Sequence, residues 1–236
     1  MKIFTKKVRD KVSTVGYQVL KIDRIRNLYC RLRYFMLRNK IRILNSSQEL
    51  VGKETLAHNM GALNNSAAFG MANRMTLLLY PLAAIFRDKK EAKVLIVGPR
   101  TEDDIFWARS LGMEAALGFD LFSYSSLVHV GDIHKTSFND AEFDAVILGW
   151  VISYSNNPEQ MINECKRIVK RRGYIAIGIE SNPEHRRTGL FKSPRSNSLN
   201  SGAEISQISG LPIIFMHDPI EEFSTDNAVI LQNTQC

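Results

Sequence analysis

The sequence predicts an α/β fold built around a mostly parallel sheet, and features in the middle of the chain support this prediction. An apolar run at residues 93–97 ends in Gly98 and passes into a helical pattern at residues 105–111, and a second run, at residues 115–119, ends in Asp120. Short, fully apolar runs are typical of strands buried on both faces of a sheet. A strand that feeds a glycine turn, followed by a strand that ends in a carboxylate, is typical of sheets that bind adenosine-type ligands.

Helices are expected ahead of this first strand. Between residues 19 and 44, apolar side chains recur at three- and four-residue spacing, which predicts an amphipathic helix. Residues 45–66 are rich in Asn, Ser and Gly and are expected to form a connector. Residues 67–87 predict an apolar helix that is too short and too interrupted to favour crossing a bilayer, so it is expected to cover the sheet. We therefore divide the chain into a basic helical extension with its connector, residues 1–66, and an α/β domain, residues 67–236.

The α/β domain continues with alternating strands and helices. Residues 128–132 are expected to form a short strand and residues 143–149 a fully buried one. An amphipathic helix over residues 159–171 is expected to end at Gly173, the residue type that most often follows a helix. Residues 174–179 are expected to form the next buried strand. This alternation predicts parallel strands joined by crossover helices.

The end of the chain predicts a different connection. Two strand patterns, at residues 211–216 and 228–231, are separated by an acidic loop that contains proline. They are expected to pair as an antiparallel hairpin. The sheet is thus expected to be mostly parallel with one reversed edge strand.

Positive charge is concentrated at the start of the chain. Residues 1–42 hold 13 Lys and Arg against two acids, a net charge of +11, whereas the remainder holds 18 against 22, a net charge of −4. Two interpretations are open. Either the apolar stripe of the first helix packs on the α/β domain or on a second subunit of a homo-oligomer, or the basic helix docks on anionic lipid or nucleic acid. Lipid is favoured over RNA, because Tyr29, Tyr34 and Phe35 are too few for a stacking platform.

The cysteines point to a reducing compartment. Cys30, Cys165 and Cys236 are odd in number and widely spaced, and they form no CxxC pair and no Cys/His cluster. We therefore expect neither a disulfide framework nor a structural metal site. No apolar stretch is followed by a small-residue cleavage site, so we expect a cytoplasmic protein rather than a secreted one, peripheral at the membrane if the basic helix docks there.

The order of these pieces resembles the class I S-adenosylmethionine-dependent methyltransferases. The resemblance covers residues 93–232 and rests on residues 94–98, 118–120, 131–134 and 143–150, with the helix and strand that follow. It implies a Rossmann-like sheet of seven strands with a C-terminal antiparallel hairpin, S-adenosyl-L-methionine as cofactor, and methyl transfer as the activity.

The resemblance also implies which residues contact the cofactor. The glycine loop would approach the methionine part, the two strand-end carboxylates would border the ribose and the adenine, and the end of the 143–149 strand would lie beside the sulfonium. The residues implied in this way are Gly98, Pro99, Arg100, Thr101, Asp120, Leu121, Asp132, Ile133, Gly149 and Trp150. Ordinary turn carboxylates at Asp120 and Asp132, and a core role for Trp150, are the alternatives.

The residues after the loop favour this cofactor over a dinucleotide. Glu102, Asp103 and Asp104 are expected in the first turn of a helix, where carboxylates complement the helix dipole. The same three charges would repel a pyrophosphate at that position. A sulfonium cofactor carries no phosphate and tolerates them better.

The candidates for catalysis are His134, Tyr154 and Glu180, any of which could act as a general base for a hydroxyl acceptor. Four Lys and Arg side chains in residues 184–195 could receive an anionic acceptor. The sequence therefore predicts a methyltransferase that acts on a small-molecule, glycan or lipid-linked acceptor.

Two alternatives stay open. Pro99, Arg100 and Glu102 stand where the family commonly has further glycines, which is compatible with a methyltransferase-like binding or scaffold protein without catalysis. The basic extension is compatible with a nucleic-acid methyltransferase.

Overall fold

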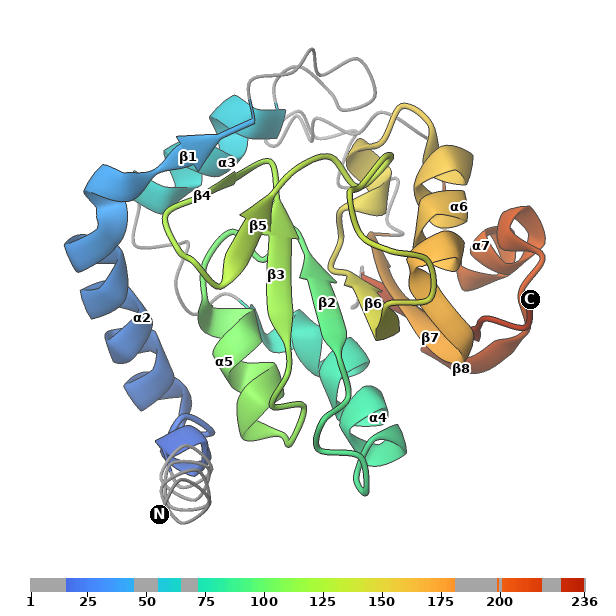
Figure 1. Cartoon of the computed structure of the whole chain (residues 1–236), viewed down its shortest axis with the longest axis horizontal. Helices are drawn as coiled ribbons and strands as arrows, with labels where there is room; N and C mark the ends of the chain where they lie inside the picture. The colour runs from blue at the N-terminus through green and yellow to red at the C-terminus, as the bar shows by residue number, and fades with distance from the viewer. Residues whose placement is uncertain are drawn as a thin grey trace.

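A computed structural model of the chain describes residues 16–44, 55–64, 72–180, 199, 201–217 and 226–235. Its centre is a seven-stranded sheet with the strand order β5-β3-β2-β6-β7-β9-β8 (Figure 1). The strands are β2 (Val94–Val97), β3 (Leu117–Asp120), β5 (Val128–Val130), β6 (Phe143–Leu148), β7 (Val169–Glu180), β8 (Ile213–His217) and β9 (Asp226–Gln232). The strands from β5 to β7 run parallel, and β9 is antiparallel to both of its neighbours. The predicted fold class is confirmed.

The position of the reversed strand differs from the prediction. The reversed strand is β9, which lies between β7 and β8, so the edge of the sheet is β8. Burial explains this order. The β9 side chains from Ala228 to Leu231 are buried and have a neighbouring strand on each side, whereas Ile213, Ile214 and Met216 of β8 are exposed.

Helices cover both faces of the sheet. One face packs against α4 (Thr76–Ile85) and α5 (Asp103–Ser110), and the other packs against α6 (Pro158–Ile168) and α7 (Gly202–Ser209). The apolar run of β2 supplies both cores, because alternate side chains point to opposite faces: Val94 and Ile96 join the first core, Leu95 and Val97 the second. This arrangement fixes the carboxyl ends of the parallel strands, where the loops meet.

Gly173 does not end a helix, contrary to the prediction. Helix α6 ends at Ile168 and strand β7 begins at Val169, so Gly173 lies inside the strand. The pairing of β6 with β7 shifts register here, and Arg172 adopts a φ of 64°. A Cβ atom on Gly173 would lie 2.7 Å from the carbonyl oxygen of Asp144. The glycine is required by close approach of two backbones.

The N-terminal region forms several elements rather than the single helix expected over residues 19–44. Helix α2 (Asp23–Leu37) is followed by the short helix η1 (Arg38–Lys40) and by β1 (Arg42–Ile43), which pairs with β4 (Phe122–Ser123). The expected connector contains a further helix, α3 (Thr55–Asn64). The proposed boundary at residue 66 falls between α3 and the described start of η3 (Ala72–Met75), and it stays a prediction.

The inner face of helix α2 combines arginines with Cys30, Tyr34 and Leu37, and the apolar stripe lies on the opposite side. The helix lies beside α5 (Figure 1), and its buried residues are Arg26 and Cys30. Leu28, Leu32 and Phe35 are exposed. The interpretation in which the apolar stripe packs on the protein's own domain is therefore wrong. The reason is electrostatic, because the arginines of the inner face have carboxylate partners on the neighbouring helix.

Candidate functional site

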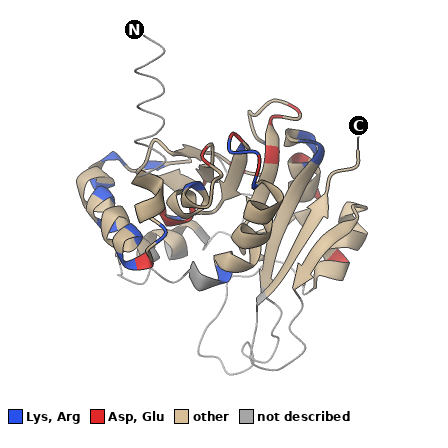
Figure 2. Cartoon of the chain, turned by 90° about the horizontal axis from the view of Figure 1, so that it is seen from below, with Lys and Arg blue, Asp and Glu red and all other residues tan. Residues whose placement is uncertain are grey.

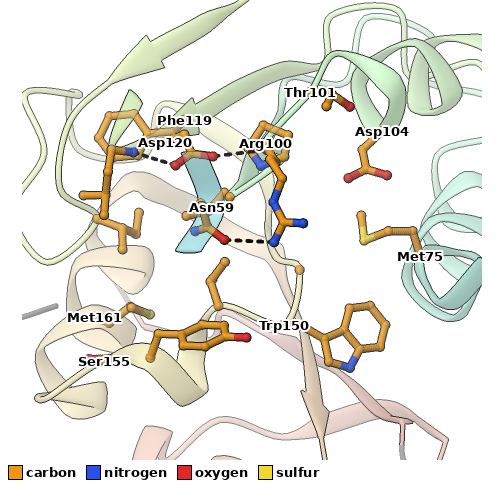
Figure 3. A pocket seen from close by; sticks show the side chains of 18 of the residues that line it. Asn59, Met75, Arg100, Thr101, Asp104, Phe119, Asp120, Trp150, Ser155 and Met161 are labelled. Atoms are coloured by element: carbon orange, nitrogen blue, oxygen red, sulfur yellow. Dashed lines mark hydrogen bonds between the residues drawn. The ribbon is translucent and has the colours of Figure 1, made fainter. Parts of the chain in front are cut away.

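A cavity of about 160 Å³ lies at the carboxyl ends of the parallel strands (Figure 3). The chain crosses from one side of β2 to the other here, and open α/β sheets bind ligands at such a switch point. The cavity is lined by all ten residues predicted to contact the cofactor: Gly98, Pro99, Arg100, Thr101, Asp120, Leu121, Asp132, Ile133, Gly149 and Trp150. The structure thus brings the predicted set together, and its role in cofactor binding stays a prediction.

In the loop after β2, Arg100 adopts a left-handed backbone conformation that is usual for glycine. Gly98 has a φ of 71°, and a Cβ atom there would collide with the Val151 side chain. Arg100 has a φ of 51°, a conformation that glycine adopts at little cost. Its guanidinium donates a hydrogen bond of 2.8 Å to Oδ1 of Asn59 in α3. Sequence reasoning missed Asn59, because α3 was interpreted as connector.

Asp120 ends β3 and is held by backbone amides. Its Oδ1 accepts a hydrogen bond of 2.7 Å from the Leu121 amide, and its Oδ2 accepts one of 3.1 Å from the Arg100 amide (Figure 3). Burial raises the pKa of Asp120 to about 6, although these amides favour the charged form. Because a carboxylate oxygen accepts more than one hydrogen bond, Asp120 keeps the capacity to accept bonds from a ligand's hydroxyl groups.

Asp104 is a second carboxylate on the cavity wall, and sequence reasoning assigned it only to the helix dipole. Its Oδ1 is buried and has no hydrogen-bond partner among the residues that the structure describes. Burial, reinforced by the charge of Asp103, raises its pKa to about 7. A buried carboxylate oxygen without a partner is costly unless a ligand supplies the missing interaction. A cationic group in the cavity would do so.

The two acids before Asp104 are neutralised by helix α2. Nε and Nη2 of Arg33 lie 2.5 Å and 2.7 Å from the two carboxylate oxygens of Glu102, a bidentate pair. Nε of Arg26 lies 3.1 Å from Oδ1 of Asp103. Of three consecutive acids, two therefore pair with arginines of α2, and Asp104 lacks an arginine partner of this kind within the described residues.

His134 lies behind the cavity wall and not on it. Its Nδ1 is 2.6 Å from Oδ1 of Asp132, and its Nε2 is 2.6 Å from Oγ of Ser155. Although burial opposes ionisation, hydrogen bonds from His134 lower the pKa of Asp132. A carboxylate at Nδ1 leaves Nε2 to accept the Ser155 hydroxyl proton. Ser155 and Asp132 both line the cavity, and sequence reasoning missed Ser155 because serine has no spacing signature here.

The other predicted catalytic residues differ in placement. Tyr154 ends the short helix η4 (Ile152–Tyr154) and lines the cavity. Glu180 is the last residue of β7, and its side chain lies outside the described residues, as does the basic segment 184–195. Within the described part of the chain, no group of three or more His, Cys, Asp and Glu could hold a metal ion.

Trp150 is part of both the cavity wall and the core, and its role in cofactor binding stays a prediction. Gly178 of β7 makes room for it, because a Cβ atom there would lie 2.6 Å from the indole ring. On the cavity side, the guanidinium of Arg74 lies 4.7 Å from the ring centroid. Arg74 therefore brings positive charge to the wall, as a cation stacked on an aromatic face.

Comparison with known proteins finds a methyltransferase match over part of the chain and a shared fold. Residues 108–177 match a family model described as a methyltransferase domain. A Haloferax volcanii methyltransferase, solved in complex with the Trm112 methyltransferase activator, shares the fold with a TM-score of 0.56 at 16% identity, over 79% of this chain and 98% of that one. The trans-methyltransferase CalH, in complex with SAH, has a TM-score of 0.51 at 14% identity, over 66% of this chain and 55% of that one.

One curated relative also matches. An uncharacterised protein of Methanocaldococcus jannaschii is 48% identical over 42 residues. The match spans 18% of this chain and a fifth of that protein's length. Together, the family model and the shared fold confirm the predicted resemblance, and S-adenosylmethionine is the cofactor that this resemblance implies.

Proposed function

We propose that this class I S-adenosylmethionine-dependent methyltransferase methylates a small-molecule, glycan or lipid-linked acceptor through a hydroxyl group, in the cavity at the carboxyl ends of β2, β3 and β6. The observation that carries the proposal is the convergence of the Gly98 loop, Asp104 and Asp120 on one cavity. When bound, the cofactor supplies an electrophilic methyl group on a sulfonium cation.

The residues of the cavity fit that cofactor. The unpartnered Oδ1 of Asp104 suits the positive charge of its methionine part, and Asp120 suits the hydroxyl groups of its ribose. Asp132 and Ile133 would border the adenine. Gly98 lets the backbone approach closely, and the left-handed Arg100 does so without a second glycine. Tight positioning is important, because methyl transfer is an in-line displacement that depends on the alignment of the reacting atoms.

Removal of the acceptor's proton is assigned to a relay formed by Ser155, His134 and Asp132. Ser155 Oγ would accept the proton of the acceptor hydroxyl while donating its own proton to Nε2 of His134. Asp132 would stabilise the imidazolium that forms, through its contact with Nδ1. His134 acts through Ser155, since its own side chain is fully enclosed.

Arg74 supports an acceptor that carries negative charge. Its guanidinium is held against the Trp150 ring on the cavity wall. An acceptor phosphate or carboxylate at this wall would gain a charge-assisted hydrogen bond. Tyr154, which also lines the cavity, would contact the same acceptor.

Calorimetric titration with S-adenosylmethionine tests the cofactor site. We expect micromolar binding by the wild type and a loss of about tenfold, or about 1.4 kcal/mol, in Asp120→Asn. Asp88→Asn is the matched control, because Asp88 is an exposed acid outside the cavity. Equal affinity in both variants, or no binding by a folded wild type, would contradict the proposal. The acceptor is then sought by release of S-adenosylhomocysteine across hydroxylated compounds with and without an anionic group.

A further inference from the structure

The outer face of helix α2 exposes an apolar stripe. Its members are Ile25, Leu28, Leu32, Phe35 and Met36, whose exposed fractions are 40, 59, 54, 67 and 68%. Spacings of three and four residues place them on one side of the helix. Leu, Phe and Met side chains this exposed, and gathered on one helix, indicate a contact surface rather than scattered surface residues.

An arginine row lies along the border of this stripe. Arg24, Arg31 and Arg38 are exposed and follow one another at seven-residue spacing, close to two helical turns, so they form a line along the helix. The guanidinium of Arg38 lies 4.6 Å from the Phe35 ring. Figure 2 shows this helix at the left of the molecule, with Lys and Arg recurring along it.

The inner face of α2 fixes the stripe in its outward orientation. Arg26 and Arg33 pair with the carboxylates of Asp103 and Glu102, and the guanidinium of Arg26 lies 4.5 Å from the Trp107 ring. Rotating the helix to bury its apolar stripe would leave these two buried acids without their arginine partners. Exposure of the stripe is therefore part of the fold.

We propose that α2 docks the protein on an anionic lipid bilayer. The apolar stripe would enter the boundary between headgroups and acyl chains, and the arginine row would contact the headgroup phosphates. A helix with a wide apolar face and a basic border lies in the interface plane in this way. Charge complementarity selects an anionic lipid, because the exposed Arg24, Arg31 and Arg38 place positive charge along the border of the apolar stripe.

The same features argue against other occupants. Nucleic acid binding would combine the arginine row with a stacking platform of aromatic rings, but Phe35 is the one aromatic residue among the five members of the stripe. In a dimer that packs α2 on α2, the arginine rows would meet no matching acids, since the acid of α2, Asp23, already pairs with Arg26. No helix among the described residues has both the length and the apolarity needed to span a membrane.

Vesicle flotation tests the proposal with the full chain. The probes are vesicles of phosphatidylcholine alone and of equal parts phosphatidylcholine and phosphatidylglycerol. We expect wild-type protein to float with the anionic vesicles and to be released by salt. The Leu28→Ser/Leu32→Ser/Phe35→Ser variant should lose about tenfold in bound fraction, and Arg24→Gln/Arg31→Gln/Arg38→Gln should lose a similar amount.

Control measurements separate docking from folding and from catalysis. Ile214→Ser removes an exposed apolar side chain from the β8 edge and should float like the wild type. All variants should keep the wild-type melting temperature and affinity for S-adenosylmethionine. The proposal is overturned if the wild type ignores anionic vesicles, or if the stripe variant floats equally well. Two further outcomes overturn it. One is a dimer in sedimentation that the stripe variant loses, and the other is binding of RNA in place of lipid.

Discussion

In the part of the chain that the structure describes, the carboxylates at the start of α5 are paired with arginines on the side of α2, and the carboxylate on the cavity side is not. On the side of α2, Glu102 and Asp103 meet arginines at 2.5 Å and 3.1 Å. On the cavity side, Asp104 Oδ1 has no partner among the described residues. Pairing with arginine compensates the charge of the first two acids within the fold, although Oδ2 of Asp103, which also lines the cavity, has no partner among the described residues. The absence of pairing leaves the third acid dependent on whatever enters the cavity.

Breaking the paired side should have the largest effect. Arg33→Ala leaves the fully buried Glu102 without its bidentate partner, and we expect the free energy of unfolding to fall by about 3 kcal/mol. Urea denaturation measures this loss. Arg24→Ala removes an exposed arginine from the same helix and should change stability by less than about 0.5 kcal/mol. Adding Glu102→Gln to Arg33→Ala should restore part of the loss. If Arg33→Ala and Arg24→Ala lower the free energy of unfolding equally, the pairing is not structural.

The second-largest effect is expected for His134, which is paired with Asp132 and Ser155 behind the cavity wall. His134→Gln is expected to lower kcat about a hundredfold by removing the proton acceptor behind Ser155, without changing cofactor affinity. Ser155→Ala should cause a similar loss. Because the residues act as one relay, the double variant should lose no more than either single variant. A purely structural role would instead lower the melting temperature and leave kcat and its pH profile unchanged.

The unpaired side should show the smallest effect, with a characteristic pH dependence. The pKa of Asp104 is raised to about 7, so the carboxylate that suits a cation forms as the pH rises through that value. Affinity for S-adenosylmethionine is expected to rise over the same range and to level off above it. Asp104→Asn should flatten the rise and lower affinity about tenfold at alkaline pH, whereas Asp88→Asn should change neither. Calorimetry across pH tests this directly.

Stability should move in the opposite direction. Because the pKa of Asp104 is higher in the folded than in the unfolded state, the folded state retains the proton longer. Stability of the ligand-free wild type therefore falls as pH rises from about 4 to about 7, and this contribution is absent in Asp104→Asn. Above neutral pH the variant should be the more stable protein and the weaker binder. If Asp104→Asn lowers both stability and affinity above neutral pH, Asp104 is structural like its neighbours.

Sequence patterns predicted the sheet and its binding edge because these depend on local signals. Strand ends carry Gly98, Asp120 and Asp132 directly, and the fold brings such ends to one edge. Residues from outside the motifs escaped prediction. Asn59 lies in a segment without strong periodicity, and Ser155 takes part only through a histidine 21 residues away.

The orientation of α2 escaped prediction for a related reason. Its apolar stripe suggested an inward face, but the partners that decide the matter are 69 and 77 residues away, at Glu102 and Asp103. A helix pattern reports which side chains share a face, and it does not report where their partners lie. The reversed strand β9 was misplaced likewise, since pairing on both sides is a property of the assembled sheet.

The Arg33–Glu102 pair joins the outer helix to the cavity loop, since Glu102 follows Thr101 of the cavity lining directly. This connection imposes reciprocity. If binding of α2 to a surface changes the affinity of the cavity for a ligand, binding of that ligand changes the affinity of α2 for the surface by the same factor. The ion pair is thus the place where occupancy of the cavity and attachment of the helix would be thermodynamically linked.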